Sequence, residues 1–155
     1  MPVLHNTSFQ CIAFSLAGQS QLLVILIYRP PKTSTSASTT LMYEFSELLT
    51  SICSRFPSTL LLGDFNIHVD SSTCTFATEF LSLLDCFNMT QHVQGPTHTK
   101  GHTLDLVCSV GTTLTQLQCL DLAVADHLAV LFSVPIPLPS RRIKRTIAFR
   151  STRTP

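Results

Sequence analysis

Apolar residues are concentrated in two short stretches near the start of the chain, residues 9–16 and 21–28. Four small or polar residues, 17–20, separate these stretches, and the pair Pro30-Pro31 follows the second one. Short apolar runs joined by a turn sequence are typical of a β-hairpin, and consecutive prolines end a strand. The pattern therefore predicts two paired strands at the start of the domain.

Beyond a Ser/Thr-rich stretch at residues 32–40, which we expect to be a loop, the apolar period changes. Apolar residues then recur every three or four positions, which predicts an amphipathic helix capped by Thr39 or Thr40 and closed by Pro57. The residues that share this stripe are Leu41, Phe45, Leu48, Leu49, Ile52 and Phe56. A second helix is predicted from the same spacing of Phe76, Phe80, Leu83, Leu84 and Phe87.

Further short apolar runs predict strands between and after the helices. They cover residues 59–62, 89–93, 103–110, 117–124 and 128–134. Helices that alternate with buried strands, together with hairpins, indicate a layered α/β domain. Prolines at 135, 137 and 139 then end the pattern, so we expect one domain over residues 1–139 and a basic linker or tail over residues 140–155.

The composition agrees with one soluble globular domain, since 45% of the 155 residues are hydrophobic and only 12% are charged. The longest apolar run, residues 22–27, is far shorter than the roughly 20 residues of a membrane span, and the start of the chain does not read as a signal peptide. We therefore expect an intracellular protein, nuclear or cytoplasmic and not secreted, with no membrane partner.

Charge is distributed unevenly along the chain. Residues 1–140 contain nine acidic and four basic side chains, whereas residues 141–155 contain six basic side chains and no acidic one. An acidic body with a basic tail predicts a polyanionic partner, and a solvated, unfolded terminus is the alternative. The oligomeric state stays open.

The six cysteines do not indicate disulfides. None of them forms a C-x-x-C pair, and no signal peptide points to an oxidising compartment. Four of them lie within apolar patterns, where a thiol behaves as a small hydrophobic group: Cys11, Cys53, Cys108 and Cys119. We expect buried, reduced thiols.

Polar residues that can carry chemistry lie at the predicted ends of strands. Gly63, Asp64 and Asn66 follow one buried strand, Asp105 lies within an apolar strand, and His127 follows Asp126 between two apolar strands. Singly, Asp64 and Asn66 could be turn formers, and His127 could be a core histidine. Together, they provide a general base, an orienting carboxylate, an amide donor and the hard oxygen ligands that suit Mg²⁺.

A second pair of histidines is discounted as a metal site. His98 and His102 have the i, i+4 spacing of neighbours on a helix, but Gly101 and the flanking threonines indicate a turn. We therefore expect no zinc site from this pair.

Four sequence blocks in order resemble the endonuclease/exonuclease/phosphatase superfamily, and most closely the apurinic-type endonuclease domain of LINE-like (non-LTR) retrotransposons. The resemblance covers about residues 9–150. Its blocks are Ile27-Tyr28-Arg29-Pro30-Pro31, then Gly63-Asp64-Phe65-Asn66, then Thr97 to Gly101-His102-Thr103-Leu104-Asp105-Leu106-Val107, and finally Asp126-His127.

The resemblance implies a fold and an activity. The fold is a four-layer α/β sandwich, in which helices flank two packed mixed β-sheets. The activity is Mg²⁺-dependent hydrolysis of a phosphodiester, with Mn²⁺ as an alternative ion and DNA as the partner. Asp64 would orient and deprotonate the attacking water, Asn66 would bond the scissile phosphate or position that water, and His127 would stabilise the pentacovalent phosphate.

The remaining site residues follow from the same resemblance. Asp105 would fix the tautomer of His127, while Asp126 and Asp64 would hold the metal. Tyr28 would bind phosphate, and Thr97 would contact phosphate or DNA.

Two departures from the family pattern affect these expectations. Ala125 stands where the family usually has a serine before the final Asp-His. The family also begins with a strand that ends in Asn and a strand that carries a metal-binding Glu, and neither is found here. We therefore expect the carboxyl-terminal part of the domain, its N-terminal portion missing, with impaired activity and an exposed apolar sheet face.

Two other functions stay open. One is a catalytically dead relic or nucleic-acid-binding fragment that uses the basic tail. The other is a phosphatase or phospholipase of the same superfamily.

Overall fold

The computed structural model describes residues 7–16, 22–31 and 35–136. The chain begins with the predicted hairpin, in which β1 (Gln10–Leu16) pairs antiparallel with β2 (Leu22–Tyr28). Helix α1 (Thr35–Cys53) then connects β2 to β3 (Ser58–Asp64), which runs parallel to β2. Parallel neighbours require such a crossover, because the chain must return to the same end of the sheet.

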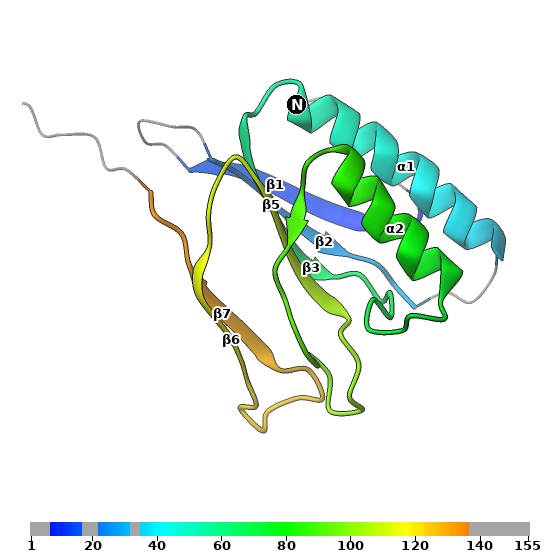
Figure 1. Ribbon diagram of the computed structural model, residues 1–155, viewed down its shortest axis with the longest axis vertical. Coiled ribbons are helices and arrows are strands. Elements are labelled where there is room, and N and C mark those ends of the chain that lie inside the picture. The colour runs from blue at the N-terminus through cyan, green and yellow to red at the C-terminus, as the bar shows by residue number, and fades with distance from the viewer. Residues whose placement is uncertain (1–6, 17–21, 32–34, 137–155) are drawn as a thin grey trace, which may run out of the picture.

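The remaining strands complete a five-stranded sheet in the order β1-β2-β3-β5-β4. Helix α2 (Thr75–Cys86) leads to the short strand β4 (Thr90–Gln91), and both β3 and β4 pair antiparallel with β5 (Asp105–Val110). A second sheet has two antiparallel strands, β6 (Thr115–Leu120) and β7 (Ala129–Ser133). The described residues therefore form a mixed α/β structure with two sheets and two helices (Figure 1).

Both helices pack on one face of the five-stranded sheet. Alternate residues of β2 and β3, including Leu23, Ile25 and Leu61, point into this helical layer and are at most 1% exposed. Phe45 of α1 and Phe80 of α2 meet there with ring centroids 5.1 Å apart, and both are fully buried. The helix-covered face therefore contains the main hydrophobic core.

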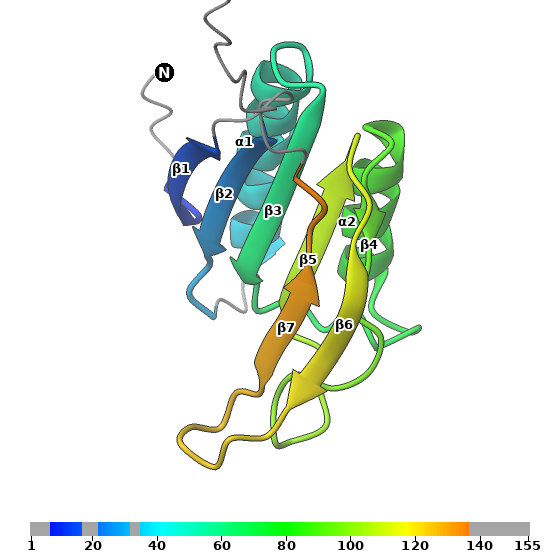
Figure 2. The same ribbon diagram turned by 90° about the vertical axis from the view of Figure 1, so that its left-hand side faces the viewer.

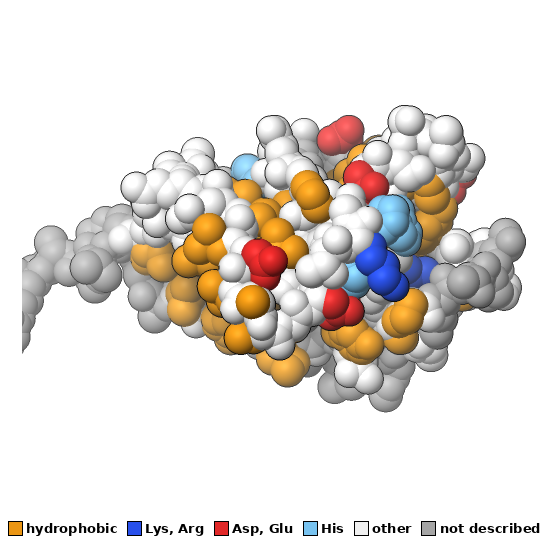
Figure 3. All heavy atoms as spheres, turned by 90° about the horizontal axis from the view of Figure 1, so that it is seen from below, with side chains coloured by type: hydrophobic (Ala, Val, Ile, Leu, Met, Phe, Trp, Pro, Cys, Tyr) orange, Lys and Arg blue, Asp and Glu red, His pale blue; other side chains and the backbone are white. Residues whose placement is uncertain are grey.

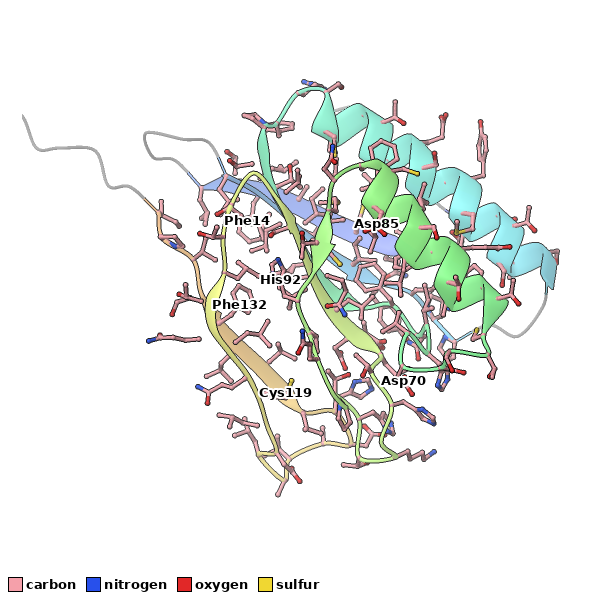
Figure 4. All side chains as sticks on the ribbon, viewed as in Figure 1. Phe14, Asp70, Asp85, His92, Cys119 and Phe132 are labelled. Carbon is pink, nitrogen blue, oxygen red and sulfur yellow. The ribbon has the colours of Figure 1, made fainter. Side chains whose placement is uncertain are left out.

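The two-stranded sheet packs on the opposite face (Figure 2). Leu22, Val24 and Leu60 lie beneath it and form a smaller buried cluster. Phe132 on β7 and Cys119 on β6, both labelled in Figure 4, pack against this cluster. The described part of the chain thus has three layers: helices, a five-stranded sheet and a two-stranded sheet.

Part of that second face is exposed. Ile12, Phe14 and Leu16 of β1 pair with Leu26, Val24 and Leu22 of β2, and cross-strand partners share a face. The exposed apolar patch consists of Ile12 (69% exposed), Phe14 (43%), Leu16 (37%) and Leu26 (43%). An exposed apolar sheet face was expected from the sequence, and this patch confirms it.

Three predictions differ from the structure. Helix α1 begins at Thr35, so Thr39 and Thr40 lie inside the helix and neither caps it. The hydroxyl of Thr40 donates to the carbonyl of Ser36, which satisfies a polar side chain within a helix and allows the Ser/Thr-rich segment to be helical. Cys11 is exposed rather than buried, while Cys108 is buried as expected.

The charged tail and the turn at residues 17–20 lie outside the described residues. In the described ranges, neither helix combines the length and the apolar character that a membrane crossing requires.

Candidate active site

Three predicted site residues lie in one row across the five-stranded sheet. Tyr28 ends β2 and pairs in register with Asp64 at the end of β3, which pairs in turn with Asp105 at the start of β5. Register partners project from the same face, and here it is the face that β6 and β7 cover, because Leu60 and Val107 point to it from the same strands. Strand pairing alone therefore brings these three side chains together.

The backbone around Asp64 is shaped by unusual conformations. Gly63 has φ +138°, and a Cβ there would lie 1.8 Å from the carbonyl oxygen of Ile27, so only glycine fits. The glycine thus permits a close approach of the backbones of β2 and β3. Two residues later, Asn66 has φ +48°, in the left-handed region that asparagine tolerates.

This turn holds Asn66 against Asp64. The backbone N–H of Asn66 donates to Asp64 Oδ1 at 3.0 Å, and the side-chain Nδ2 donates to Asp64 Oδ2 at 2.8 Å. The same Nδ2 also donates to the backbone carbonyl of Arg29 at 2.7 Å. Asp64 and Asn66 are therefore one fixed unit rather than two independent turn residues.

Arg29 is a part of the site that the sequence analysis did not assign. Its side chain is 3% exposed, and its guanidinium donates to the carbonyls of Asn66 at 2.8 Å and Phe65 at 3.3 Å. The guanidinium also lies 5.5 Å from the ring centroid of Phe76, and its backbone N–H donates to the carbonyl of Asp64. The sequence did contain a signal for this role, because Arg29 is a charged residue directly after an apolar strand. A buried arginine is rare unless its charge is paired with other groups in the fold.

The second half of the site is a chain of contacts from Thr97 to His127. Thr97 is fully buried, and its Oγ1 accepts from the backbone N–H groups of Leu104 and Asp105 at 3.0 and 2.9 Å. The carboxylate of Asp105 then accepts a hydrogen bond from His127 Nδ1 at 2.8 Å. This bond leaves the other ring nitrogen of His127 for a ligand, as the predicted role of Asp105 requires.

His98 contacts both His127 and Asp126. The rings of His98 and His127 meet edge to face with centroids 4.9 Å apart, and the two residues form an isolated β-bridge. His98 Nδ1 accepts from the backbone N–H of Lys100, and its Nε2 lies 3.3 Å from Asp126 Oδ2. The prediction that His98 and His102 lie on a turn is consistent with the hydrogen bond from His98 N–H to the carbonyl of His102.

The surroundings of Asp64 and His127 raise the pKa of both side chains. Burial raises the pKa of Asp64, and the neighbouring Asp105 charge raises it further, while hydrogen bonds from Asn66 and the charge of His127 oppose the rise. The hydrogen bond to Asp105 raises the pKa of His127, as do the charges of Asp105, Asp64 and Asp126. His127 thus stays protonated to higher pH than an isolated histidine, and Asp64 holds a proton more readily than an isolated aspartate.

Two groups of side chains in the described ranges could hold a metal ion, because their ligand atoms lie within 4.8 Å of one another. One group is His98, Asp126 and His127, and the other is His68, Asp70 and His102. Asp64, which the sequence analysis paired with Asp126 as a metal ligand, belongs to neither group. That pairing stays a prediction.

The fold resembles the endonuclease/exonuclease/phosphatase fold. A sequence profile described as endonuclease–reverse transcriptase matches residues 22–131, more than half of the chain. The chain belongs to this endonuclease–reverse transcriptase family, which confirms the resemblance found in the sequence. No curated protein sequence matched the chain.

Three solved structures share the fold. The endonuclease domain of TRAS1, a telomere-specific non-LTR retrotransposon, aligns with a TM-score of 0.65 at 12% identity over 81% of this chain and 62% of its own. The human Nocturnin catalytic domain aligns with a TM-score of 0.55 at 21% identity, over 81% and 53%. Beta toxin from Staphylococcus aureus aligns with a TM-score of 0.53 at 12% identity, over 79% and 56%. The chain therefore spans less than two thirds of each of these three structures.

Proposed function

We propose that the chain is the Mg²⁺-dependent DNA endonuclease domain of a retrotransposon, and that it hydrolyses phosphodiesters with Asp64, Asn66, Asp105 and His127. The observation that carries the proposal is the register of β3 and β5, which places the Asp64–Asn66 pair beside the Asp105–His127 pair. A general base beside a protonated donor is the arrangement that hydrolysis of a charged ester requires. Family membership provides the reaction class.

Each residue has a distinct task in this proposal. Asp64 orients the attacking water and accepts its proton, with its carboxylate fixed by the two hydrogen bonds from Asn66. His127 donates to a non-bridging phosphate oxygen through the ring nitrogen that Asp105 leaves available. Tyr28, which is 46% exposed at the end of the same row, binds phosphate. Thr97 was expected to contact phosphate or DNA, but it is fully buried and its hydroxyl accepts from backbone donors, so we assign it a role that acts through Asp105.

The donor set at the row fits Mg²⁺. Carboxylate oxygens are its preferred protein ligands, and the repulsion between Asp105 and Asp64, which adds to the effect of burial, is relieved by a divalent cation. Asp64 and Asp126 would hold the ion. When bound, Mg²⁺ polarises a phosphoryl oxygen and neutralises developing charge.

We further propose that the domain ends at residue 139 and that residues 140–155 bind the nucleic-acid backbone within the cell, in the nucleus or cytoplasm. The support is the six basic side chains in residues 141–155, which contain no acidic one. Contacts to phosphate give a steep fall of log K with log salt concentration. A chain shortened to residues 1–139 should bind DNA more weakly with a shallower salt slope, and an unchanged slope would contradict this role.

Nicking of supercoiled plasmid tests the catalytic proposal. The full chain with Mg²⁺ should nick DNA, and Asp64→Asn should reduce the rate by about 10²–10⁴-fold, the usual contribution of a general base. Asp85→Asn is the matched control, because Asp85 is an exposed acid on α2, which packs on the opposite face of the sheet (Figure 4). Equal nicking by the Asp64 variant and the wild type would overturn the proposal.

A further inference from the structure

A second group of polar side chains lies outside the row of proposed catalytic residues. His68 and Asp70 come from the loop between β3 and α2, and His102 comes from the loop before β5. The ligand atoms of these three residues lie within 4.8 Å of one another. Figure 4 shows Asp70 in the loops beyond the ends of the helices, and Figure 3 shows histidine side chains exposed beside charged ones at this end of the molecule.

Asp70 is already held in position to act as a ligand. Its Oδ1 accepts from the backbone N–H of Thr103 at 3.0 Å, and Thr103 is itself fixed by a hydrogen bond from its hydroxyl to the carbonyl of Gly95. Oδ2 is left for His102, whose Nδ1 lies 3.2 Å away. A ligand carboxylate oriented by an outer hydrogen bond is typical of metal sites.

His68 distinguishes this group from an ordinary histidine–carboxylate pair. A hydrogen bond between His102 and Asp70 needs no second imidazole, yet the rings of His68 and His102 lie edge to face with centroids 4.3 Å apart. The two rings come from loops that are far apart in sequence. Their close approach beside a fixed carboxylate is the arrangement that a shared metal ion explains.

The chemistry of the donors selects the ion. Two imidazole nitrogens and one carboxylate oxygen suit Zn²⁺ and neighbouring transition metals, whereas Mg²⁺ prefers oxygen donors alone. Zn²⁺ is commonly held by three protein ligands with water in the fourth position. Solvent reaches the group, because His68 and Asp70 are exposed and a pocket of about 210 Å³ opens beside Asp70 and Thr103.

We propose that His68, Asp70 and His102 form a Zn²⁺ site that links the loop after β3 to the loop before β5. The ion takes the place of the hydrogen bond between His102 Nδ1 and Asp70 Oδ2, and the ring proton of the neutral imidazole is then carried by Nε2. The role of the Zn²⁺ ion is to position the candidate active site, because the linked loops carry Asn66 and Thr97. The carbonyl of His102 accepts from the backbone N–H groups of both Thr97 and His98, so restraint of His102 reaches the second half of the candidate active site directly.

Calorimetric titration of the metal-free full chain with Zn²⁺ tests this proposal without any assay of hydrolysis. The wild type should bind Zn²⁺ at this site, and His68→Ala and His102→Ala should each bind that ion at least 10-fold more weakly. His127→Ala should retain that binding, because His127 belongs to the other donor group. Mg²⁺ at the same concentration should give no heat that depends on His68 or His102.

Thermal unfolding provides a second readout, and it shows whether the variants fold. A ligand that binds only the native state raises Tm, so Zn²⁺ should raise the Tm of the wild type and of His127→Ala more than that of His68→Ala. Metal-free His68→Ala should melt close to the metal-free wild type, since His68 is exposed. Unchanged Zn²⁺ affinity in the His68 and His102 variants, or its loss in the His127 variant alone, would overturn the proposal.

Discussion

The two faces of the five-stranded sheet differ in what covers them and in what they do. The face toward α1 and α2 is closed by helices, and its side chains, such as Ile25 and Leu61, are almost completely buried. The face toward β6 and β7 is covered only in part. It holds the row of Tyr28, Asp64 and Asp105 and leaves the exposed apolar patch uncovered.

The difference follows from the two-residue period of a strand. In β3, Leu61 points to the helices, while Leu60, Leu62 and Asp64 point to the other face. One strand therefore provides core residues from one set of positions and site residues from the other. We infer that substitutions on the helix-covered face act on stability and that substitutions on the second face act on activity and association.

The largest effect on stability should come from the helix-covered face. Phe45→Ala removes a fully buried ring that contacts Phe9, Phe65 and Phe80, so it should lower the free energy of unfolding by about 3–5 kcal/mol. Phe132→Ala is the matched change on the second face, where the ring is only partly buried, and it should cost less than half as much. Urea unfolding of both variants measures the difference, and equal losses would contradict the comparison.

The next largest effect should be on activity, from Asp105→Asn. The variant replaces the charged acceptor of His127 with a neutral amide, which weakens the hydrogen bond and removes the charge that raise the pKa of His127, so the histidine deprotonates at lower pH. The nicking rate should fall by about 10²–10³-fold, the usual effect of a lost donor to developing charge. The alkaline limb of the pH–rate profile, if set by His127, should move to lower pH, while unfolding at neutral pH changes little.

The hydrogen bond between His127 and Asp105 also predicts how the stability of the fold changes with pH. A histidine whose pKa is higher in the folded state stabilises the fold fully below its unfolded pKa of about 6.5, and this contribution is lost as pH rises through the folded pKa. The wild type should therefore lose more stability than Asp105→Asn over that range. If the alkaline limb of the pH–rate profile lies at the same pH in the wild type and in Asp105→Asn, the titration of His127 does not set that limb.

Much of the fold could be predicted from local sequence pattern. The apolar runs at β2 and β3 and the stripe of α2 are strong signals, because burial on both faces or on one face imposes them. The start of α1 could not be predicted in this way, since residues 35–40 are serines, threonines and one alanine and provide no apolar stripe in the sequence. The strand order β1-β2-β3-β5-β4 depends on tertiary packing and has no local signal.

The candidate site divides in the same manner. Asp64, Asn66 and Asp105 could be found because polar residues in or after apolar strands are costly without a purpose. Arg29 and His98 were missed, since their importance lies in partners that are distant in sequence: the carbonyl of Asn66 for Arg29, and His127 for His98. Such contacts exist only once β2 is beside β3 and the loop before β5 is beside β7.

A smaller effect should appear where the chain before β1 is tied to α1. Glu44 accepts hydrogen bonds from Thr7 and Ser8, and although partial burial opposes the change, these bonds lower its pKa to about 2. This contribution to stability is present above pH 4.5 and is lost as pH falls through the folded pKa. Glu44→Gln should cost on the order of 1 kcal/mol at neutral pH, because solvent screens a partly exposed carboxylate.

Acid denaturation at several pH values measures this loss. The stability of the wild type should converge on that of Glu44→Gln as pH falls from 4.5 toward 2. Glu47→Gln on an exposed position of the same helix is the control and should run parallel to the wild type. Parallel curves for both variants would mean that the carboxylate of Glu44 contributes nothing.

The smallest effect on stability should come from the exposed apolar patch, and there the comparison of the two faces is tested most directly. Phe14→Thr keeps a side chain that favours strands and removes apolar surface that is already 43% exposed, so unfolding should change by about 0.5 kcal/mol. Contiguous exposed apolar surface promotes association, so the variant should self-associate less than the wild type in concentration-dependent sedimentation. Tyr43→Gln removes a single exposed ring on α1 and should leave association unchanged. If Phe14→Thr and Tyr43→Gln reduce self-association equally, the two faces of the sheet do not differ in how they promote association.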